Sequence, residues 1–336
     1  MDTQYGTTSK LALPILVTSF NRPECLIRVF SAIRNAGYSN IFFASDGPRN
    51  LSDSVKIKEC EGLLREFFPN VTSDHILTRV SNLGCRQAMY ENVIWFFSKV
   101  EFGVILEDDC LPANDFFDFM FSTLIAYEKS SDVFIVSGYN PTSSMNSSLE
   151  VISCRKSIYP LVWGWGSWAN RISKYELDFS DYRKVVKSGQ NLAKHHQWSS
   201  AAKLKWSYLM YLAGSGKIDT WDYSLTASAW RHDQYSLHPN QNLIENLGFG
   251  PDATHTTKKA PNWATRKFSN QRHILEIFPD IDYTEEDSKQ DKIMERELYT
   301  LTFSGLLRLY LGQLKIKILD NVKKFRTTIN PGRRFN

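Results

Sequence analysis

The sequence predicts an α/β fold: a doubly wound, mostly parallel sheet with helices on both faces. Two observations carry this prediction. From residue 12 to about residue 140, short apolar segments typical of buried strands alternate with segments whose apolar residues recur at helical spacing. The connections are short, as in sheets whose parallel strands are joined by helices. At 336 residues, the chain is long enough for about two structural units.

The first predicted strand covers residues 11–20 and is followed by Asn21-Arg22-Pro23, where Pro23 suits the first turn of a helix. That helix carries its apolar residues at helical spacing over 25–36. The later elements of this half are strands at 41–44, 76–80, 103–106 and 133–137, and helices at 55–68, 86–98 and 115–127.

Polar residues directly follow three of these predicted strands. Asn21 and Arg22 follow the first, Asp46 and Gly47 follow the second, and the acidic triplet 107–109 follows the fourth. Ligands of parallel α/β sheets bind beyond the carboxyl ends of the strands. We therefore expect these residues to converge on one crevice.

The second half of the chain has a different character. Residues 163–168 (Trp-Gly-Trp-Gly-Ser-Trp) are aromatic and glycine-rich, unlike the interior of a strand or a helix. The further predictions are a helix at 206–213, a short strand or turn at 217–221, an apolar segment at 223–230 and a loop-rich stretch at 241–256. We divide the chain into a domain of residues 1–257, with halves 12–140 and 151–257, and a C-terminal extension of residues 258–336.

Composition narrows the classes of function. The net charge of +4 is too small to indicate nucleic-acid binding. The five cysteines show no CxxC spacing, so neither a zinc site nor a disulfide framework is predicted. The first ten residues lack the apolar core of a signal peptide, and no run of 18 apolar residues exists. These features predict a cytoplasmic protein.

The C-terminal extension is basic. Residues 258–290 are polar without a clear period and are predicted to be a surface excursion. From Tyr299 to the end there are eight basic residues and one acid, and an amphipathic helix is predicted over about 299–326. Such a helix either lies on an anionic membrane surface or packs on the domain with a solvated basic face.

The triplet Glu107-Asp108-Asp109 is the strongest chemical signal. Three adjacent carboxylates after a buried strand repel one another, and a hard divalent cation with oxygen ligands relieves that repulsion. Mg²⁺ or Mn²⁺ held here would neutralise charge on a departing nucleotide diphosphate. Alternatively, the three acids are solvated in a turn or cap the helix predicted after them.

The motifs around the triplet resemble the GT-A glycosyltransferase superfamily, and within it N-acetylglucosaminyltransferase I and bacterial relatives in surface-polysaccharide synthesis. The resemblance covers roughly residues 12–256 and is specific around the triplet, which is similar to that family's DxD-type motif. It is carried by Asp46-Gly47, by Asn82-Leu-Gly-Cys-Arg86, and by Val104-Ile-Leu-Glu-Asp-Asp-Cys-Leu-Pro-Ala-Asn-Asp-Phe-Phe117. It implies a metal-dependent transferase that uses a nucleotide-diphosphate sugar, with a UDP-sugar expected.

The resemblance also implies roles for single residues. Asp109 would touch the Mn²⁺ or Mg²⁺ ion directly, and Asp108 would contact the sugar or ribose with Glu107 close by. Asp46 would contact the nucleobase and Arg86 the diphosphate, where an Arg can bind phosphate oxygens bidentately. The first loop would meet the nucleotide through Ser19, Asn21 and Arg22. Alternatively, Asp46 only stabilises a turn before Gly47-Pro48, and Arg86 is a surface charge.

Asp222, after Trp221, is the candidate general base of an inverting transfer, and Asp233 is the second choice. The family carries tandem acids in this region, whereas Tyr223 follows Asp222 here, so it stays open which family acid Asp222 replaces. Alternatively, Asp222 caps a helix. His255 resembles the C-terminal histidine that several GT-A enzymes use as a further metal ligand.

The aromatic segment 163–168 is similar to a Gly-aromatic segment of the family. Trp165 and Gly166 would wall the sugar pocket, or the tryptophans form a core patch. The acceptor, a saccharide or a lipid-linked saccharide, is expected in the second half, and a membrane-bound tail would suit a lipid-linked acceptor. Two other functions fit the same features: a nucleotidyltransferase, although no Gly-rich phosphate loop follows the first strand, and a non-catalytic nucleotide-sugar binding protein.

Overall fold

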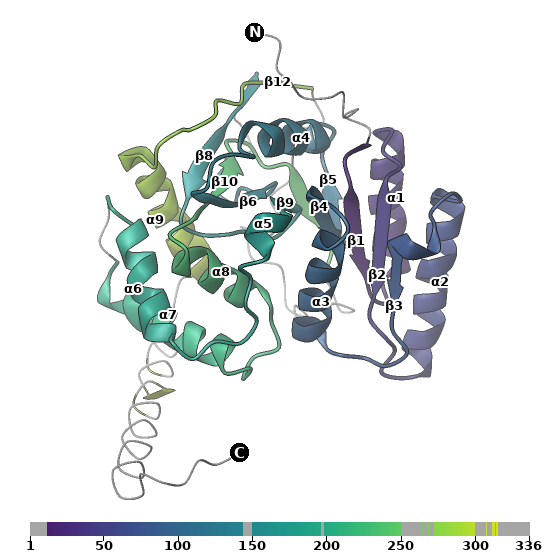
Figure 1. Cartoon of the computed structure of the whole chain (residues 1–336), viewed down its shortest axis with the longest axis horizontal. Helices are drawn as coiled ribbons and strands as arrows, with labels where there is room; N and C mark the ends of the chain where they lie inside the picture. Colours follow the sequence, from purple (N-terminus) through teal and green to yellow (C-terminus); the bar gives the residue numbers. More distant parts are fainter. Residues whose placement is uncertain are drawn as a thin grey trace, which may run out of the picture.

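The computed structural model describes residues 12–143, 150–195, 198–249, 264, 268, 272–299, 307, 311, 312 and 314. Its centre is a mixed, mostly parallel sheet of eight strands with helices packed against it, in the order β3-β2-β1-β4-β9-β6-β10-β8 (Figure 1). The predicted α/β fold with a mostly parallel central sheet is therefore confirmed, and it is compatible with a Rossmann-like fold. The strands of this sheet are β1 (Ile15–Ser19), β2 (Ile41–Ser45), β3 (Ile76–Thr78), β4 (Phe102–Glu107), β6 (Val133–Ser137), β8 (Cys154–Ser157), β9 (Trp165–Trp168) and β10 (Tyr235–Pro239).

Strands β1 to β4 are all parallel and alternate along the chain with three helices. The alternation of buried strands with amphipathic helices predicted this half, with shifts of a few residues at the element ends. The helices are α1 (Pro23–Asn35), α2 (Leu51–Phe67) and α3 (Cys85–Phe97), and a short 3-10 turn, η2 (Ser73–His75), precedes β3.

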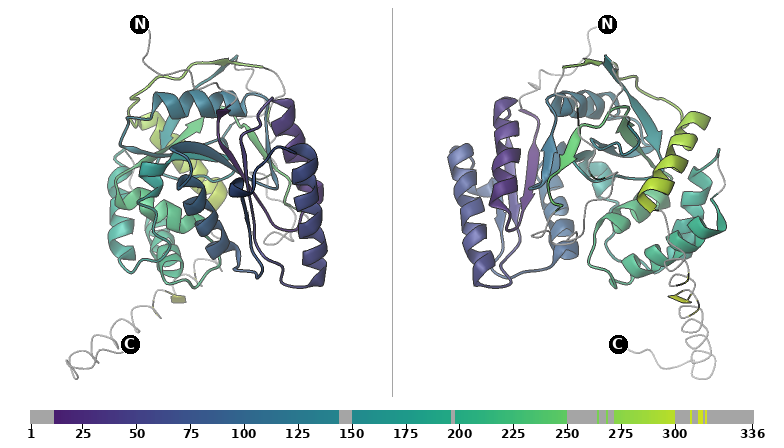
Figure 2. Two further views of the ribbon diagram at one scale, coloured as in Figure 1. Left: turned by 45° about the vertical axis from the view of Figure 1, so that its right-hand side comes forward. Right: turned by 180° about the vertical axis from the view of Figure 1, so that it is seen from behind.

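The two faces of this parallel half are covered by different helices. On one face, Val17 packs in the same cluster as Leu26 and Phe30 of α1, and α2 lies beside α1 (Figure 2). On the other face, Leu16 packs in the same cluster as Met89 of α3. Successive residues of a strand point to opposite faces, so each strand contributes to both clusters. Every residue of β1 is buried as a result.

The sheet continues through β9, and this strand corrects the prediction for residues 163–168. Trp165–Trp168 pairs antiparallel with both β4 and β6 and lies in the middle of the sheet. Trp165 is completely buried there. Gly166 is required by the packing, because a Cβ at this position would lie 3.0 Å from the carbonyl oxygen of Gly103 on β4.

The remaining elements flank the sheet. Helices α6, α7 and α8 pack on one another beside the sheet, and a two-stranded pair, β5 with β11, brings residues 244–246 next to the acidic triplet. These elements are β5 (Cys110–Pro112), α4 (Phe116–Ala126), β7 (Val151–Ile152), α5 (Ala169–Ile172), α6 (Tyr182–Leu192), α7 (Ser200–Gly214), α8 (Asp222–Arg231), β11 (Ile244–Asn246), β12 (Ile274–Leu275) and α9 (Glu285–Tyr299).

The described residues after 271 are anchored on the domain, where a surface excursion was expected up to residue 290. Strand β12 pairs with β7, and α9 packs on β8. The Asp291 carboxylate of α9 is fully buried and accepts hydrogen bonds from Arg155, Ser157, the Ile158 amide and Tyr283. A buried carboxylate with this many donors ties α9 firmly to the sheet.

The predicted basic helix over about 299–326 lies mostly outside the described residues. Beyond Tyr299, which ends α9, helical conformation is described there only at Leu307, Leu311, Gly312 and Leu314. Within the described part of the chain, none of the helices has the length and apolar character that crossing a membrane would require.

Candidate functional site

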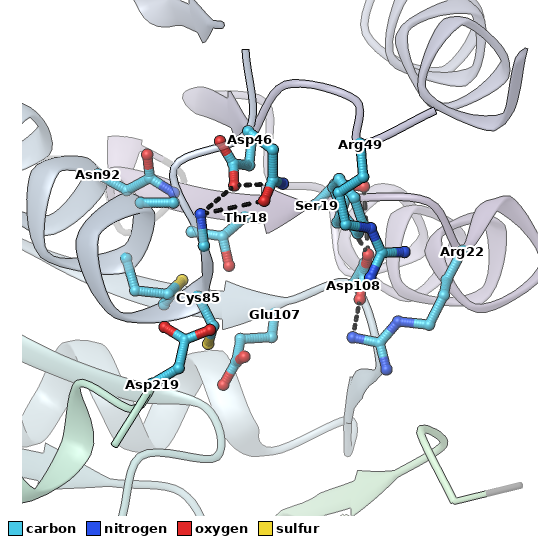
Figure 3. Close-up of a pocket in the computed structure, with 15 residues that line it drawn as sticks. Thr18, Ser19, Arg22, Asp46, Arg49, Cys85, Asn92, Glu107, Asp108 and Asp219 are labelled. Atoms are coloured by element: carbon cyan, nitrogen blue, oxygen red, sulfur yellow. Dashed lines mark hydrogen bonds and ion pairs between the residues drawn. The ribbon is translucent and has the colours of Figure 1, made fainter. Parts of the chain in front are cut away.

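A pocket of about 200 Å³ opens at the carboxyl ends of β1, β2 and β4 (Figure 3). The predicted convergence of strand ends is therefore present, although not every expected residue takes part. The pocket is lined by residues of β1 and its following loop, the loop after β2, the start of α3, the end of β4, and Asp219. These residues are Thr18, Ser19, Phe20, Arg22, Asp46, Arg49, Asn82, Gly84, Cys85, Ala88, Met89, Asn92, Glu107, Asp108 and Asp219.

The three acids of the triplet take different positions. Glu107 is the last residue of β4 and faces the α3 side of the sheet, because Ile105, two residues earlier, packs in the α3 cluster. Asp108 is buried and turns toward the loop after β1. Its carboxylate accepts hydrogen bonds from the Ser19 hydroxyl at 3.3 Å and the Phe20 amide at 3.0 Å. Ser19 therefore lies at the site, as expected.

Arg22 is the cation that pairs with both Asp108 and Asp109. Its guanidinium lies 2.6 Å from Asp108 Oδ1 and 2.5 Å from Asp109 Oδ2. Burial lowers the pKa of Arg22, but the charges of Asp108, Asp109 and Glu107 outweigh burial and raise it above the ordinary value. The guanidinium is therefore permanently charged, and it holds the first loop against the end of β4.

Burial also changes the acids of the triplet. It raises the pKa of Glu107, and the charge of Asp109 raises it further, while Arg22 acts in the opposite direction. Burial likewise raises the pKa of Asp108, against the effect of Arg22. Removing crowded carboxylates from water disfavours their ionised forms, which is the expected response of such a cluster.

Asp46 lines the pocket, but its carboxylate already holds the loop before α3. It accepts hydrogen bonds from the amides of Gly47, Leu83 and Gly84 and from Asn82 Nδ2, over 2.8–3.2 Å. The side chain therefore has the turn-stabilising role that was the alternative to a nucleobase contact. By holding the loop before α3 in place, the Asp46 carboxylate fixes one end of the pocket.

The residues after β1 and β2 are joined through Asp53. Asn21 Nδ2 donates to Asp53 Oδ1 at 2.6 Å, and Arg49 donates to both carboxylate oxygens. The hydrogen bonds from Arg49, together with that from Asn21, lower the pKa of Asp53 to about 2. Arg49 also lies over the Phe20 ring, 4.7 Å from its centroid, and lines the pocket. Asn21 thus supports Asp53 and is not itself a lining residue.

Arg86 does not line the pocket, so its placement does not support the expected diphosphate contact. Its guanidinium donates to the carbonyl oxygens of Leu177 and Ala213 and to Asp178, and only 12% of the side chain is exposed. The Arg86 amide donates to Asp219 at 2.8 Å. Arg86 therefore joins the start of α3 to the second half of the domain.

Trp165 and Gly166 are also absent from the pocket, because both are buried in β9. Trp165 packs against Trp221 with 5.8 Å between ring centroids. The core-patch alternative is therefore the one that the structure supports for Trp165. Trp163 lies instead near Tyr139 and Phe249, on the other side of Gly164.

Asp222 is the first residue of α8 and is half-buried. Its charge contributes to the raised pKa of Glu107, and its carboxylate accepts a hydrogen bond from the Thr220 hydroxyl. Asp219, three residues earlier, lines the pocket directly. Asp233 lies beyond the opposite end of α8, in a turn with φ of 53°, and is exposed.

The expected metal ligands are only partly described. His255 lies outside the described residues. Gly248 lies against Asp109, since a Cβ there would be 2.0 Å from Asp109 Oδ2, and the Leu247 amide donates to the Asp109 carbonyl at 2.8 Å. The chain before His255 therefore passes directly over the triplet.

Within the described ranges, no group of three or more His, Cys, Asp and Glu side chains is arranged to hold a metal ion. The oxygens of Asp108 and Asp109 nevertheless converge on one cation, the Arg22 guanidinium. Carboxylate oxygens are the donors that Mg²⁺ and Mn²⁺ prefer. The residues therefore fit such an ion in their chemistry, with Arg22 standing at the cation position.

The lining residues that were not predicted as site residues include the polar side chains of Thr18, Arg49, Asn82, Asn92 and Asp219. Asn82 begins the quoted motif 82–86, and Arg49 follows the turn after Asp46, so these positions were the available signal. Asn92 is a polar residue in the buried face of a helix, beside Met89 and Val93, and this break in the apolar pattern was the signal there.

Comparisons with known proteins do not assign the chain to a family. No protein-family model matches the chain, and a search of curated proteins finds no significant match.

Replacing Arg86 by Ala tests whether Arg86 connects the start of α3 to the second half of the domain. The variant should lose about 2–4 kcal/mol in free energy of unfolding, because it loses the charged hydrogen bonds from the guanidinium to the carbonyl oxygens of Leu177 and Ala213 and the side-chain packing around Arg86. Urea denaturation measures this. Arg65→Ala is the control, since exposed Arg65 donates only to Val71 and should cost less than about 1 kcal/mol. A loss in Arg86→Ala no larger than in the control would contradict the role.

Replacing Glu107 by Gln tests the buried acid. Because the pKa of Glu107 is raised in the folded state, the folded protein keeps a proton that the unfolded chain releases. The stability of the wild type therefore falls as the pH rises from the pKa of the unfolded chain to that of the folded state. The Gln variant lacks this loss. Its melting temperature in EDTA should rise relative to wild type between about pH 5 and about pH 9, with no gain near about pH 4. A difference that is independent of pH would show that Glu107 titrates normally.

Proposed function

We propose that the chain is a glycosyltransferase of the GT-A kind, which moves a sugar from a nucleotide-diphosphate sugar to a saccharide or lipid-linked acceptor. One observation carries this proposal: the loop after β1, the loop after β2 and the acidic end of β4 surround a single pocket. UDP-sugars are the donors to test first, because of the resemblance in the motifs around Glu107-Asp108-Asp109.

The topology supports a nucleotide site at this place. The parallel strands run in the order β3-β2-β1-β4, so the chain order reverses between β1 and β4. Open α/β sheets bind ligands at this kind of reversal, in the crevice beyond the carboxyl ends of the strands. Thr18 of β1 and Glu107 of β4 are register partners across the reversal, and both line the pocket.

The charges divide the pocket into two ends. Arg22 marks one end, next to Asp108, and Arg49 lies nearby (Figure 3). A diphosphate fits this end, because an arginine can bind phosphate oxygens bidentately. Asp109, with His255, would hold Mn²⁺ or Mg²⁺ beside it. Such an ion supplies positive charge that stabilises the nucleotide diphosphate as it departs.

The acceptor side is proposed around Asp222. A general base must reach the acceptor hydroxyl directly or through one water. Asp222 lies at the start of α8, three residues after the pocket-lining Asp219, and its charge acts on Glu107. Transfer with inversion follows if this carboxylate takes the proton from the acceptor as the hydroxyl attacks the sugar.

Two other functions use the same fold. A non-catalytic nucleotide-sugar binding protein is favoured by one observation: Arg22 already forms ion pairs with Asp108 and Asp109. A nucleotidyltransferase is less well supported, since no Gly-rich loop follows β1.

Association of the basic C-terminal segment with the inner face of a membrane is proposed for a lipid-linked acceptor. A chain that ends at Glu297 should lose binding to liposomes, and unchanged binding would contradict this association.

The donor proposal is tested by thermal shift with UDP-N-acetylglucosamine, UDP-galactose and UDP-glucose in the presence of Mn²⁺. A bound donor at a hundredfold excess over its Kd stabilises the protein by about 2.7 kcal/mol. Asp109→Asn should remove the Mn²⁺-dependent part of the shift. Asp282→Asn, at an exposed position, is the control and should respond as wild type does. If no nucleotide sugar changes the melting temperature, with or without metal, the proposed function is wrong.

The base is tested by turnover of the donor that the thermal-shift screen selects. Asp222→Asn should lower kcat for its transfer or slow hydrolysis by about 10²–10⁴-fold, with the Kd of the donor unchanged, because a general base acts on the chemical step. Asp233→Asn should keep the wild-type kcat. Equal kcat for Asp222→Asn and wild type would place the base elsewhere, with Asp219 as the next carboxylate to replace.

A further inference from the structure

The inner end of the pocket is formed by β1 and α3. Thr18 follows Leu16 by two residues on β1 and therefore faces α3, where Asn92 and Met89 point back toward the sheet. Thr18 is 4% exposed and Asn92 is 3% exposed, yet both line the pocket. Figure 3 shows Asn92 and Arg22 at opposite ends of the pocket, so this end is the one away from the proposed diphosphate.

The orientation of the Asn92 amide is fixed by Arg79. Arg79 Nη1 donates to Asn92 Oδ1 at 2.8 Å, and Arg79 Nη2 pairs with Glu91 at 3.2 Å. An arginine can only donate, so the amide oxygen must face Arg79. The Asn92 NH₂ group is thereby left for the pocket. In the part of the chain that the structure describes, this NH₂ group has no hydrogen-bond acceptor.

Thr18 is the second open polar group at this end. Among the described residues, its hydroxyl makes no hydrogen bond. Both polar groups open into the same pocket, so a ligand that displaces water from this end must offer them hydrogen bonds, since a polar group left without a partner on binding costs free energy. Ala88 and Met89 supply apolar surface between them, which suits the face of a flat ring.

The polar groups of Asp46 and Asn82 are already satisfied. The Asp46 carboxylate accepts from the loop amides and from Asn82, and Asn82 Oδ1 accepts from the Gly84 amide. Glu107, the register partner of Thr18, is the carboxylate beside this end of the pocket. The Asn92 NH₂ group offers a donor only, so the ligand must present an acceptor there.

We propose that Asn92 and Thr18 bind the carbonyl oxygen at C4 of a pyrimidine or C6 of a purine in the donor's nucleobase, so that Asn92 selects bases with a keto oxygen at that position over bases with an amino group there. The inference rests on the proposed function, since it takes the ligand to be a nucleotide. Uracil and guanine present a carbonyl oxygen where cytosine and adenine present an NH₂ group. An amino base would place two donors against each other, which a buried site rejects strongly.

The test is calorimetric binding of UDP, CDP, GDP and ADP with Mn²⁺ to the full chain. Wild type should bind UDP at least about tenfold more tightly than CDP, and GDP more tightly than ADP, because a mismatched buried donor is costly. Asn92→Asp keeps the volume and the contact with Arg79 but turns the donor into an acceptor. The ratio of the CDP Kd to the UDP Kd should fall about tenfold or more in this variant, and effects on the diphosphate cancel in the ratio.

Two further variants separate the role of each group. Thr18→Val should weaken UDP binding several-fold with little change in the ratio, because a hydroxyl can donate or accept. Glu91→Gln is the matched control, since it touches Arg79 but does not line the pocket, and it should leave the ratio unchanged.

The outcomes are distinguishable. Nucleotide binding with no preference between UDP and CDP, or an unchanged ratio in Asn92→Asp, overturns the role of Asn92 and leaves the proposed function standing. Absence of binding by every nucleotide overturns both. Circular dichroism of each variant confirms that a changed ratio comes from a folded protein.

Discussion

The site depends on one interaction, the contact of Arg22 with Asp108 and Asp109. Crowded carboxylates at the end of a buried strand would repel one another, and burial disfavours their ionised forms. The guanidinium at 2.5–2.6 Å from both acids offsets this repulsion and fixes the first loop over the end of β4. Because Asp108 also accepts from Ser19 and Phe20, the same carboxylate sets the wall of the pocket.

The site also depends on the connection between the two halves of the domain. Arg86 binds the carbonyl oxygens of Leu177 and Ala213, and its amide binds Asp219. These contacts hold the loop before α8 against the start of α3. Asp219 and Asp222 therefore stand beside a pocket that is otherwise built from the first half, which is how residues far apart in the sequence share one site.

The sequence predicts the parallel half of the fold well, because each strand and helix there follows a local period of buried residues. It fails at β9, where Gly166 and Trp165 resemble a loop and become a central strand only through their neighbours β4 and β6. The sequence also does not predict the contacts of Arg86, whose partners Leu177 and Ala213 lie about 90 and about 130 residues away in the chain. The resemblance that implied a diphosphate contact depends on the position of Arg86 in the chain, which does not determine the direction of its side chain. Glu107, Asp108, Ser19 and Arg22 line the pocket because position at a strand end alone brings them together, and Asp109 lies beside them in contact with Arg22.

Charge balance decides what the pocket needs from a ligand. With all three acids ionised, the triplet and Arg22 sum to −3 + 1 = −2. Arg49 adds little, because Asp53 already binds it through both carboxylate oxygens. A diphosphate would enter a region of the same sign, and its binding requires added positive charge or proton uptake. The raised pKa of Glu107 supplies part of the answer, since a protonated Glu107 removes one negative charge. A divalent cation would supply the rest with one ion, so the proposed metal at Asp109 and the proposed anionic donor are physically linked: each would favour binding of the other.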